Sequence, residues 1–163
     1  MKSILRVLAV LCVLLTAAPV GRDTGARQAA PTARTTERVS VASDESQGES
    51  HSEWPSISAD GRYVAFRSDA TNLIGGDTNN AQDIFIHDHL FRTTERISVA
   101  SDDSQGNAGS YHPSISADGR YVAFRSDATN LVGDDTNGLL DVFVRDRGVQ
   151  PPLINLYLPV VVR

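Results

Sequence analysis

One nineteen-residue stretch occurs twice in this chain, letter for letter. It reads PSISADGRYVAFRSDATNL and occupies residues 55–73 and again 113–131. The match extends well beyond it, because residues 35–92 align with 93–150 without a gap, at a constant shift of 58 positions. In a tandem repeat of this kind, each copy forms one structural unit, which buries its faces against the neighbouring units. The duplication therefore predicts two similar modules, 35–92 and 93–150.

Each copy predicts four short β-strands and no helix. β-Branched and aromatic residues cluster in short pieces, and no segment keeps a helical period for more than a turn. Asp60-Gly61 and its counterpart Asp118-Gly119 are typical of tight hairpin turns, in which glycine takes the left-handed position. The fold class is therefore all-β, with two four-stranded antiparallel sheets. In the first copy the expected strands are 37–42, 55–58, 63–68 and 83–88, and those of the second copy lie 58 residues later.

The order of these strands predicts an offset between repeats and sheets. Each copy begins with an outer strand, so strand 95–100 of the second copy completes the sheet of the first. The second sheet then lacks an outer strand of its own. Either 37–42 supplies it within a ring, or the tail 151–163 supplies it in place.

The motif Ser-x-Ser-Ala-Asp-Gly-Arg-Tyr-Val-Ala-Phe, followed by Asp-hydrophobic-Phe-hydrophobic-x-Asp, resembles the WD-repeat-like propeller repeats of TolB and related bacterial envelope proteins. The resemblance covers residues 35–147 and implies a β-propeller fold in a periplasmic or extracellular protein, with no particular reaction. The loops 43–54 and 72–82 are longer than in a typical blade of that group. A closed propeller has about four to eight blades, so two blades form an incomplete one. We expect either a homo-oligomeric ring of several chains or a chain shortened from a longer propeller.

The two ends of the chain differ from the repeats. Lys2 and Arg6 precede an apolar run at 7–15 and then small residues, the pattern of a secretory signal-peptide helix at 1–18, with a cleavage site as late as about 33. An uncleaved anchor is the alternative, although the run is short for a span of about 20 residues. Residues 19–34 predict a flexible leader and 151–163 an apolar tail. The expected location is secreted, periplasmic or at the cell surface, with no stable membrane span after cleavage.

Charge and composition limit the classes of molecule that this protein could bind. The formal charge is −5, and loss of Lys2 and Arg6 with the signal peptide makes it −7. No basic run or stripe is present, which argues against nucleic acid. The single cysteine, Cys12, lies in the signal peptide, so no disulfide is expected. A protein or a glycan remains the expected partner.

Two polar loops, 75–83 and 133–141, are the candidate metal sites. Asp and Asn at alternate positions supply the oxygen ligands that calcium prefers, and the spacing resembles the calcium loops of integrin-type propellers. One acidic position is replaced by Gly75 and by Gly133. The alternative is that these residues are simply good loop formers. The candidate ligands are Asp77, Asn79 and Asp83 in the first copy and Asp135, Asn137 and Asp141 in the second.

Trp54 and Tyr111 lie shortly before the expected strands 55–58 and 113–116. They are the candidate partner-binding residues, and packing between the sheets is the alternative. No nucleophile–base pair, phosphate loop or cofactor motif is present, so we expect no catalysis and no cofactor other than calcium. The expected function is a secreted or envelope interaction module. The alternatives are a calcium-dependent, lectin-like propeller and the propeller remnant of a larger TolB-like or peptidase-associated protein.

Overall fold

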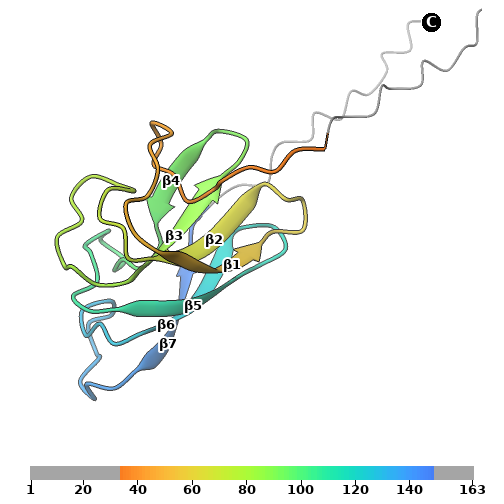
Figure 1. The fold of residues 1–163 in the computed structure, drawn as a ribbon. Helices are drawn as coiled ribbons and strands as arrows, with labels where there is room; N and C mark the ends of the chain where they lie inside the picture. Colours follow the sequence, from red (N-terminus) through yellow and green to blue (C-terminus); the bar gives the residue numbers. More distant parts are fainter. Residues whose placement is uncertain (1–33, 149–163) are drawn as a thin grey trace, which may run out of the picture. The chain divides into compact units, whose positions relative to one another are not determined.

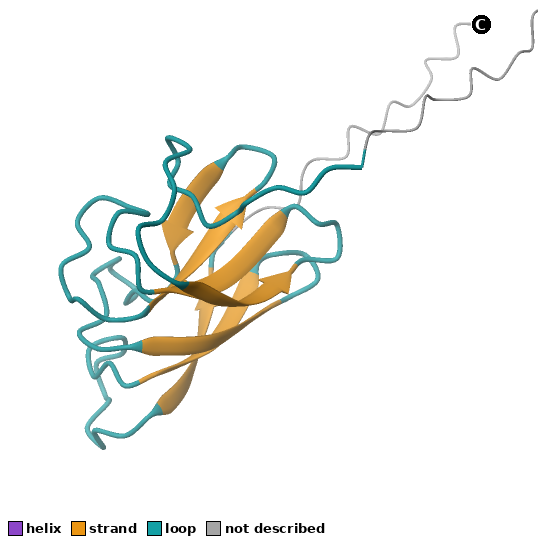
Figure 2. Cartoon of the chain, in the orientation of Figure 1, coloured by secondary structure: helices purple, strands orange, loops and turns teal. Residues whose placement is uncertain are grey.

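The computed structural model describes residues 34–148, which form two antiparallel β-sheets without a helix (Figures 1 and 2). Both sheets lie in one compact unit that begins at Thr36. The predicted signal peptide, the predicted leader up to residue 33 and the predicted tail lie outside the described residues. Within the described part, no helix of the length and apolarity needed to cross a membrane is found.

The first sheet has four strands in the order β1-β2-β3-β4. The outermost strand, β4, comes from the second repeat, as the order of the predicted strands requires, but it covers 93–96 and not the predicted 95–100. It pairs with β3 so that Glu95 lies opposite Ile86 and Thr94 opposite His87. The strands are β1 (Ser52–Ile57), β2 (Tyr63–Ser68), β3 (Asp83–Asp88) and β4 (Thr93–Arg96).

The second sheet has three strands among the described residues, so the expectation of two four-stranded sheets is wrong there. They are β5 (Ser110–Ile115), β6 (Tyr121–Ser126) and β7 (Asp141–Asp146), in that order. The predicted strand at 37–42 is also wrong, because this segment is irregular apart from one bridge between Val41 and Gln47. A strand needs a neighbour for its N–H and C=O groups, and β4 has β3, whereas no strand pairs with 37–42. Among residues 34–148, β7 is consequently an edge strand.

The main core lies between the two sheets. Alternate residues of β2 and β3, including Ala65, Ile84 and Ile86, turn one face of the first sheet towards the second, and none of the three is more than 1% exposed. Val122 and Phe124 of β6 pack against them. Full burial of one such side chain contributes about 1.5–3 kcal/mol, so this shared layer joins the two repeats.

The opposite face of the first sheet is covered by its own loops. Phe66 and Phe85 stack with ring centroids 6.0 Å apart, and Ala70 and Leu73 from the following loop complete this cluster. β2 and β3 are therefore buried on both faces, which explains why all four apolar residues at the start of β2 are buried.

The hairpin turns have the same geometry in both copies. Ser58 donates a hydrogen bond to the Asp60 carboxylate (2.6 Å), which also accepts one from the Arg62 amide (3.0 Å), and Gly61 has a φ of 75°. Asp118 and Gly119 repeat this arrangement. The two glycines differ in their surroundings, however, because a Cβ on Gly61 would meet open space, whereas one on Gly119 would overlap the ring of Tyr63.

Candidate functional site

The predicted calcium ligands of the first copy surround an arginine. Arg96, the last residue of β4, places Nη2 3.3 Å from Asp77 Oδ2 and Nε 3.3 Å from Asp83 Oδ2. The side chains of all three residues are almost fully buried, at 5%, 3% and 0% exposure. The N–H groups are not aligned with the oxygens closely enough for hydrogen bonds, so the attraction is mainly between the charges. The Arg96 guanidinium therefore lies beside two of the residues that the sequence suggested as calcium ligands.

Further partners from the second copy complete this cluster. Gln105 Nε2 donates to Asp77 Oδ1 (2.9 Å) and to Asp83 Oδ2 (3.2 Å), and Ser98 Oγ donates to Asp83 Oδ1 (2.6 Å). Asn79 donates to the backbone oxygen of Gly106 (2.8 Å). Burial raises the pKa of Asp83, and the bond from Ser98 and the charge of Arg96 act against that rise. We define Arg96, Ser98 and Gln105 as the clamp residues.

In this arrangement the predicted calcium ligands Asp77 and Asp83 of the first loop have protein partners. The carboxylate oxygens already accept hydrogen bonds, and a second cation would lie beside a buried guanidinium. Across residues 34–148, no three His, Cys, Asp or Glu side chains are grouped so that they could hold a metal.

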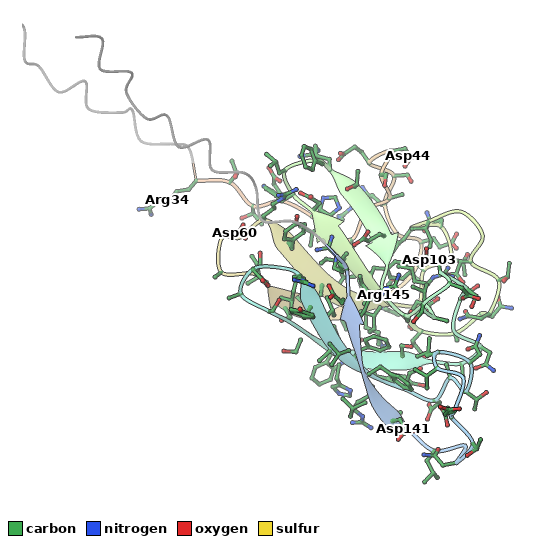
Figure 3. All side chains as sticks on the ribbon, turned by 180° about the vertical axis from the view of Figure 1, so that it is seen from behind. Arg34, Asp44, Asp60, Asp103, Asp141 and Arg145 are labelled. Carbon is green, nitrogen blue, oxygen red and sulfur yellow. The ribbon has the colours of Figure 1, made fainter. Side chains whose placement is uncertain are left out.

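The second loop has the same carboxylates but lacks the clamp. Asn137 donates to Asp141 Oδ2 (3.0 Å), and both oxygens of Asp135 are buried without a hydrogen-bond partner among the described residues. In Figure 3, Asp141 lies at the far end of β7, at the margin of the second sheet. An unpaired buried carboxylate costs free energy. We call this loop, which has Asp135 and Asp141 but no clamp residues among the described part of the chain, the half-site. At the positions 58 residues after Arg96, Ser98 and Gln105 the chain has Ile154, Leu156 and Arg163.

The second sheet also exposes the face that the first sheet buries. Val142 and Val144 are 73% and 65% exposed, whereas their counterparts Ile84 and Ile86 are 0% and 1% exposed. Tyr121 is likewise exposed, while Tyr63 is buried. We call Tyr121, Val142 and Val144 the receiving surface. It adjoins the outer edge of β7, with which no strand of the described part of the chain pairs.

Trp54 and Tyr111 have different environments. Trp54 lies in a β-bulge of β1 with a φ of 55°, is half exposed, and places its ring 4.5 Å from that of His112. His112 is its true counterpart at the 58-residue shift and has a φ of 53°. Tyr111 lies on β5 and donates a hydrogen bond to Asp127 (3.2 Å); burial and that bond raise its pKa. The structure thus brings Trp54 to His112 rather than to Tyr111.

Sequence reasoning missed His112 and the clamp residues. Both were readable from the constant shift: position 54 corresponds to 112, and the Thr-Thr-Glu-Arg of residues 93–96 recurs at 35–38. That identity shows that the segment ending in Arg96 is part of the repeated sequence and not a linker between the two copies.

A scan against family models and a search of curated proteins both found nothing that matches this chain.

Proposed function

We propose that this chain is a non-catalytic interaction module of β-propeller type, secreted or held in the cell envelope, which binds a protein along β7 and the receiving surface. The observation that carries the proposal is the exposure of Val142 and Val144, at positions where the first sheet buries Ile84 and Ile86. The same side-chain positions are core in one sheet and surface in the other.

The combination of an open edge and an apolar face favours strand addition by a partner. An edge strand offers a row of unpaired N–H and C=O groups, and a contiguous exposed apolar patch marks an interaction site. In strand addition the backbone bonds supply affinity and the alternate side chains supply specificity. Val142 and Val144 lie two residues apart on one face of β7, which suits this mode of recognition.

Two arrangements support a binding role over a catalytic one. His87 is buried, and because the Thr94 hydroxyl already donates to the backbone oxygen of Val41 (2.6 Å), His87 Nδ1–H must donate to Thr94 Oγ1 (2.9 Å). The carboxylate of Asp83 is occupied by Ser98, Gln105 and Arg96. His87 is 3% exposed and Asp83 is 0% exposed, so neither side chain is open to a substrate.

A peptide with the sequence of residues 93–106 tests the proposal directly. It contains β4 and all three clamp residues, so we expect it to bind the ¹⁵N-labelled full chain and to shift the amide signals of Val142 and Val144. The matched control is the same peptide with Glu95→Pro, which removes one backbone donor. Shifts that are absent from β7, or equal with both peptides, would refute strand addition at this edge.

A glycan is the second candidate partner, and Trp54 favours it. A half-exposed Trp held at positive φ beside His112 is a strained arrangement, and such strain concentrates at functional sites. Oligosaccharide titration followed by tryptophan fluorescence tests this directly, because Trp54 is the single tryptophan of the chain. An unchanged emission spectrum across a panel of glycans would exclude it.

A further inference from the structure

We infer that the partner at β7 is a second copy of this chain, bound head to tail through its residues 35–48; this rests on the proposed function of the open edge. The second copy supplies a fourth strand to the second sheet, three clamp residues to Asp135 and Asp141, and a covering surface. Three independent observations lead to this occupant.

The first observation is a strand sequence without a strand. Residues 35–38 read Thr-Thr-Glu-Arg, identical to β4, yet they are exposed and irregular here. β4 pairs with β3 so that Glu95 lies opposite Ile86. Shifting both residues by one repeat places Glu37 opposite Val144 of β7, the edge strand that has no outer neighbour. The sequence that completes the first sheet is thus present a second time, and a second chain can bring it to β7 in the same register.

The second observation is the half-site at Asp135. Its counterpart Asp77 contacts Arg96 and Gln105, whereas both oxygens of Asp135 are buried and unpartnered among the described residues. Arg38 corresponds to Arg96 and forms no ion pair with any described residue. Bringing a guanidinium to two carboxylates removes the cost of their unpaired burial. The complete counterpart set to the clamp is Arg38, Ser40 and Gln47.

The third observation is a matching pair of exposed surfaces. Where the second sheet packs on the first, Pro113 and Gly119 are buried and Ile115 is half-buried. Their counterparts on the first sheet are exposed, Ile57 by 62%. We call these counterparts, Pro55, Ile57 and Gly61, the docking surface.

The docking surface fits the receiving surface through a contact that already exists within the chain. Tyr63 packs where a Cβ on Gly119 would be, so Tyr121 of one copy would occupy the open space beside Gly61 of the next. A hollow of about 230 Å³ beside Phe66, lined also by Arg38, Val39 and Pro55, lies next to this surface. Residues 38–40 would leave that hollow when they pair with β7 of the neighbouring chain.

The alternative occupant, the tail of the same chain, lacks the required chemistry. At the register of β4 it has Pro151 and Pro152, which have no N–H to donate. Ile154 and Leu156 stand at the positions of Arg96 and Ser98. The guanidinium of the tail, Arg163, stands at the position of Gln105, so the tail has no counterpart of Arg96 at the register of β4.

A head-to-tail contact uses two different surfaces, so it propagates until a ring closes. Since a propeller takes about four to eight blades, a ring contains about two to four chains of two sheets each. Light scattering of the full chain at tens of micromolar should therefore give a multiple of the chain mass. A strictly monomeric protein would overturn the inference.

Two single substitutions, each with a matched control, test the interface. Ile97 N donates to the backbone oxygen of Ile84 (2.7 Å). In an antiparallel pair of strands every second pair of opposite residues is hydrogen-bonded, so the pair of Glu95 and Ile86 is bonded too. By the same register, Glu37 would be hydrogen-bonded to Val144. Thr94 N instead donates to Ser43 Oγ (3.0 Å). Glu37→Pro should weaken association by about tenfold or more, because it removes a ladder bond, while Thr36→Pro should have a much smaller effect. Asp135→Asn should weaken it by a similar factor, and Asp134→Asn, its exposed neighbour, should not.

Mixing two defective chains tests the polarity of the contact. Glu37→Pro impairs the donated strand and leaves the receiving surface intact, whereas Val144→Asp does the reverse. Each variant alone should be monomeric, and an equimolar mixture should form a 1:1 dimer and nothing larger. A mixture that stays monomeric, or association that survives all of these substitutions, would overturn the inference.

The peptide of residues 93–106 separates failure here from failure of the proposed function. If the full chain is monomeric and the peptide still shifts β7, the edge binds a protein other than this chain. If the chain is monomeric and its β7 amides are protected from hydrogen exchange, the tail occupies the edge. Either result rejects the second copy, and only the loss of peptide binding also rejects strand addition.

Discussion

Arg96 and Asp83 belong to different repeats, yet their side chains meet at 3.3 Å in the interior of the first sheet. This contact is possible because β4, from the second repeat, forms the outer strand of the first sheet. The first repeat therefore depends on the second for its last strand and for the charge that balances its acidic loop.

Removal of the buried guanidinium should destabilise the protein. Arg96→Leu leaves Asp77 and Asp83 buried without a cation, and we expect the free energy of unfolding in urea to fall by about 3 kcal/mol. Arg38→Leu, made in the Glu37→Pro background that keeps chains apart, should change it by about 0.5 kcal/mol or less. Equal losses in the two variants would contradict the asymmetry between the sheets.

Truncation of equivalent aliphatic residues should give unequal costs. Ile86 is 1% exposed and Val144 is 65% exposed. Ile86→Ala should lower the free energy of unfolding by about 2–5 kcal/mol, because it leaves a cavity between the sheets. In the Glu37→Pro background, Val144→Ala should cost about 0.5 kcal/mol or less, as measured by thermal and urea unfolding.

The two hairpin glycines form a third matched pair. Both have φ near +75°, so either substitution by alanine adds strain of about 1 kcal/mol. Gly119→Ala should cost about 1–3 kcal/mol more, since the new methyl displaces the ring of Tyr63. A calorimetric melting temperature lowered equally by both would show that Gly119 is not closely packed.

His87 should make stability depend on pH near neutrality. Burial lowers the pKa of His87 below its ordinary value of 6.5, so the unfolded chain binds the proton more readily. The stability that this difference provides is present above pH 6.5 and is lost as the pH falls through the lower pKa of the folded state. His87→Gln should reduce the change in the free energy of unfolding between pH 7 and pH 5, as measured by urea unfolding at each pH.

Asp146 should titrate unusually low. The hydrogen bonds from Arg120, together with the Gly148 amide, lower its pKa from 3.8 to about 2. Its contribution to stability is therefore present above pH 3.8 and is lost as the pH falls through about 2. Carboxyl ¹³C NMR should detect this value, and Arg120→Ala should raise it towards 3.8. A pKa near 3.8 in the unsubstituted chain would mean that the pair does not form in solution.

Local patterns were sufficient to predict most of the strands. The segment Tyr-Val-Ala-Phe-Arg-Ser is a six-residue strand in both copies, and the Asp-Gly turn before it is closed by the same Ser–Asp bond. The offset of β4 into the preceding sheet also followed from the order of the strands. These features depend on neighbours in the sequence, which are identical in the two repeats.

The candidate site depends on neighbours in space, and the predictions about its ligands stay open. The loop at Asp77 has the composition of a calcium site, but Arg96, Ser98 and Gln105 arrive from the next repeat and occupy its oxygens. Composition could not reveal this, because the clamp lies beyond the loop in the sequence and reaches it only through the pairing of β4.

One tetrapeptide separates the two sources of information. Thr-Thr-Glu-Arg is a strand at Thr93–Arg96 and irregular at 35–38, although the letters are the same. The sequence by itself determined the strand units, their turns and their repetition, because these follow from side-chain alternation and backbone preference over a few residues. Tertiary structure alone decided which copy is paired, buried and charge-balanced, because a strand becomes part of a core only where another chain segment satisfies its backbone and covers its side chains.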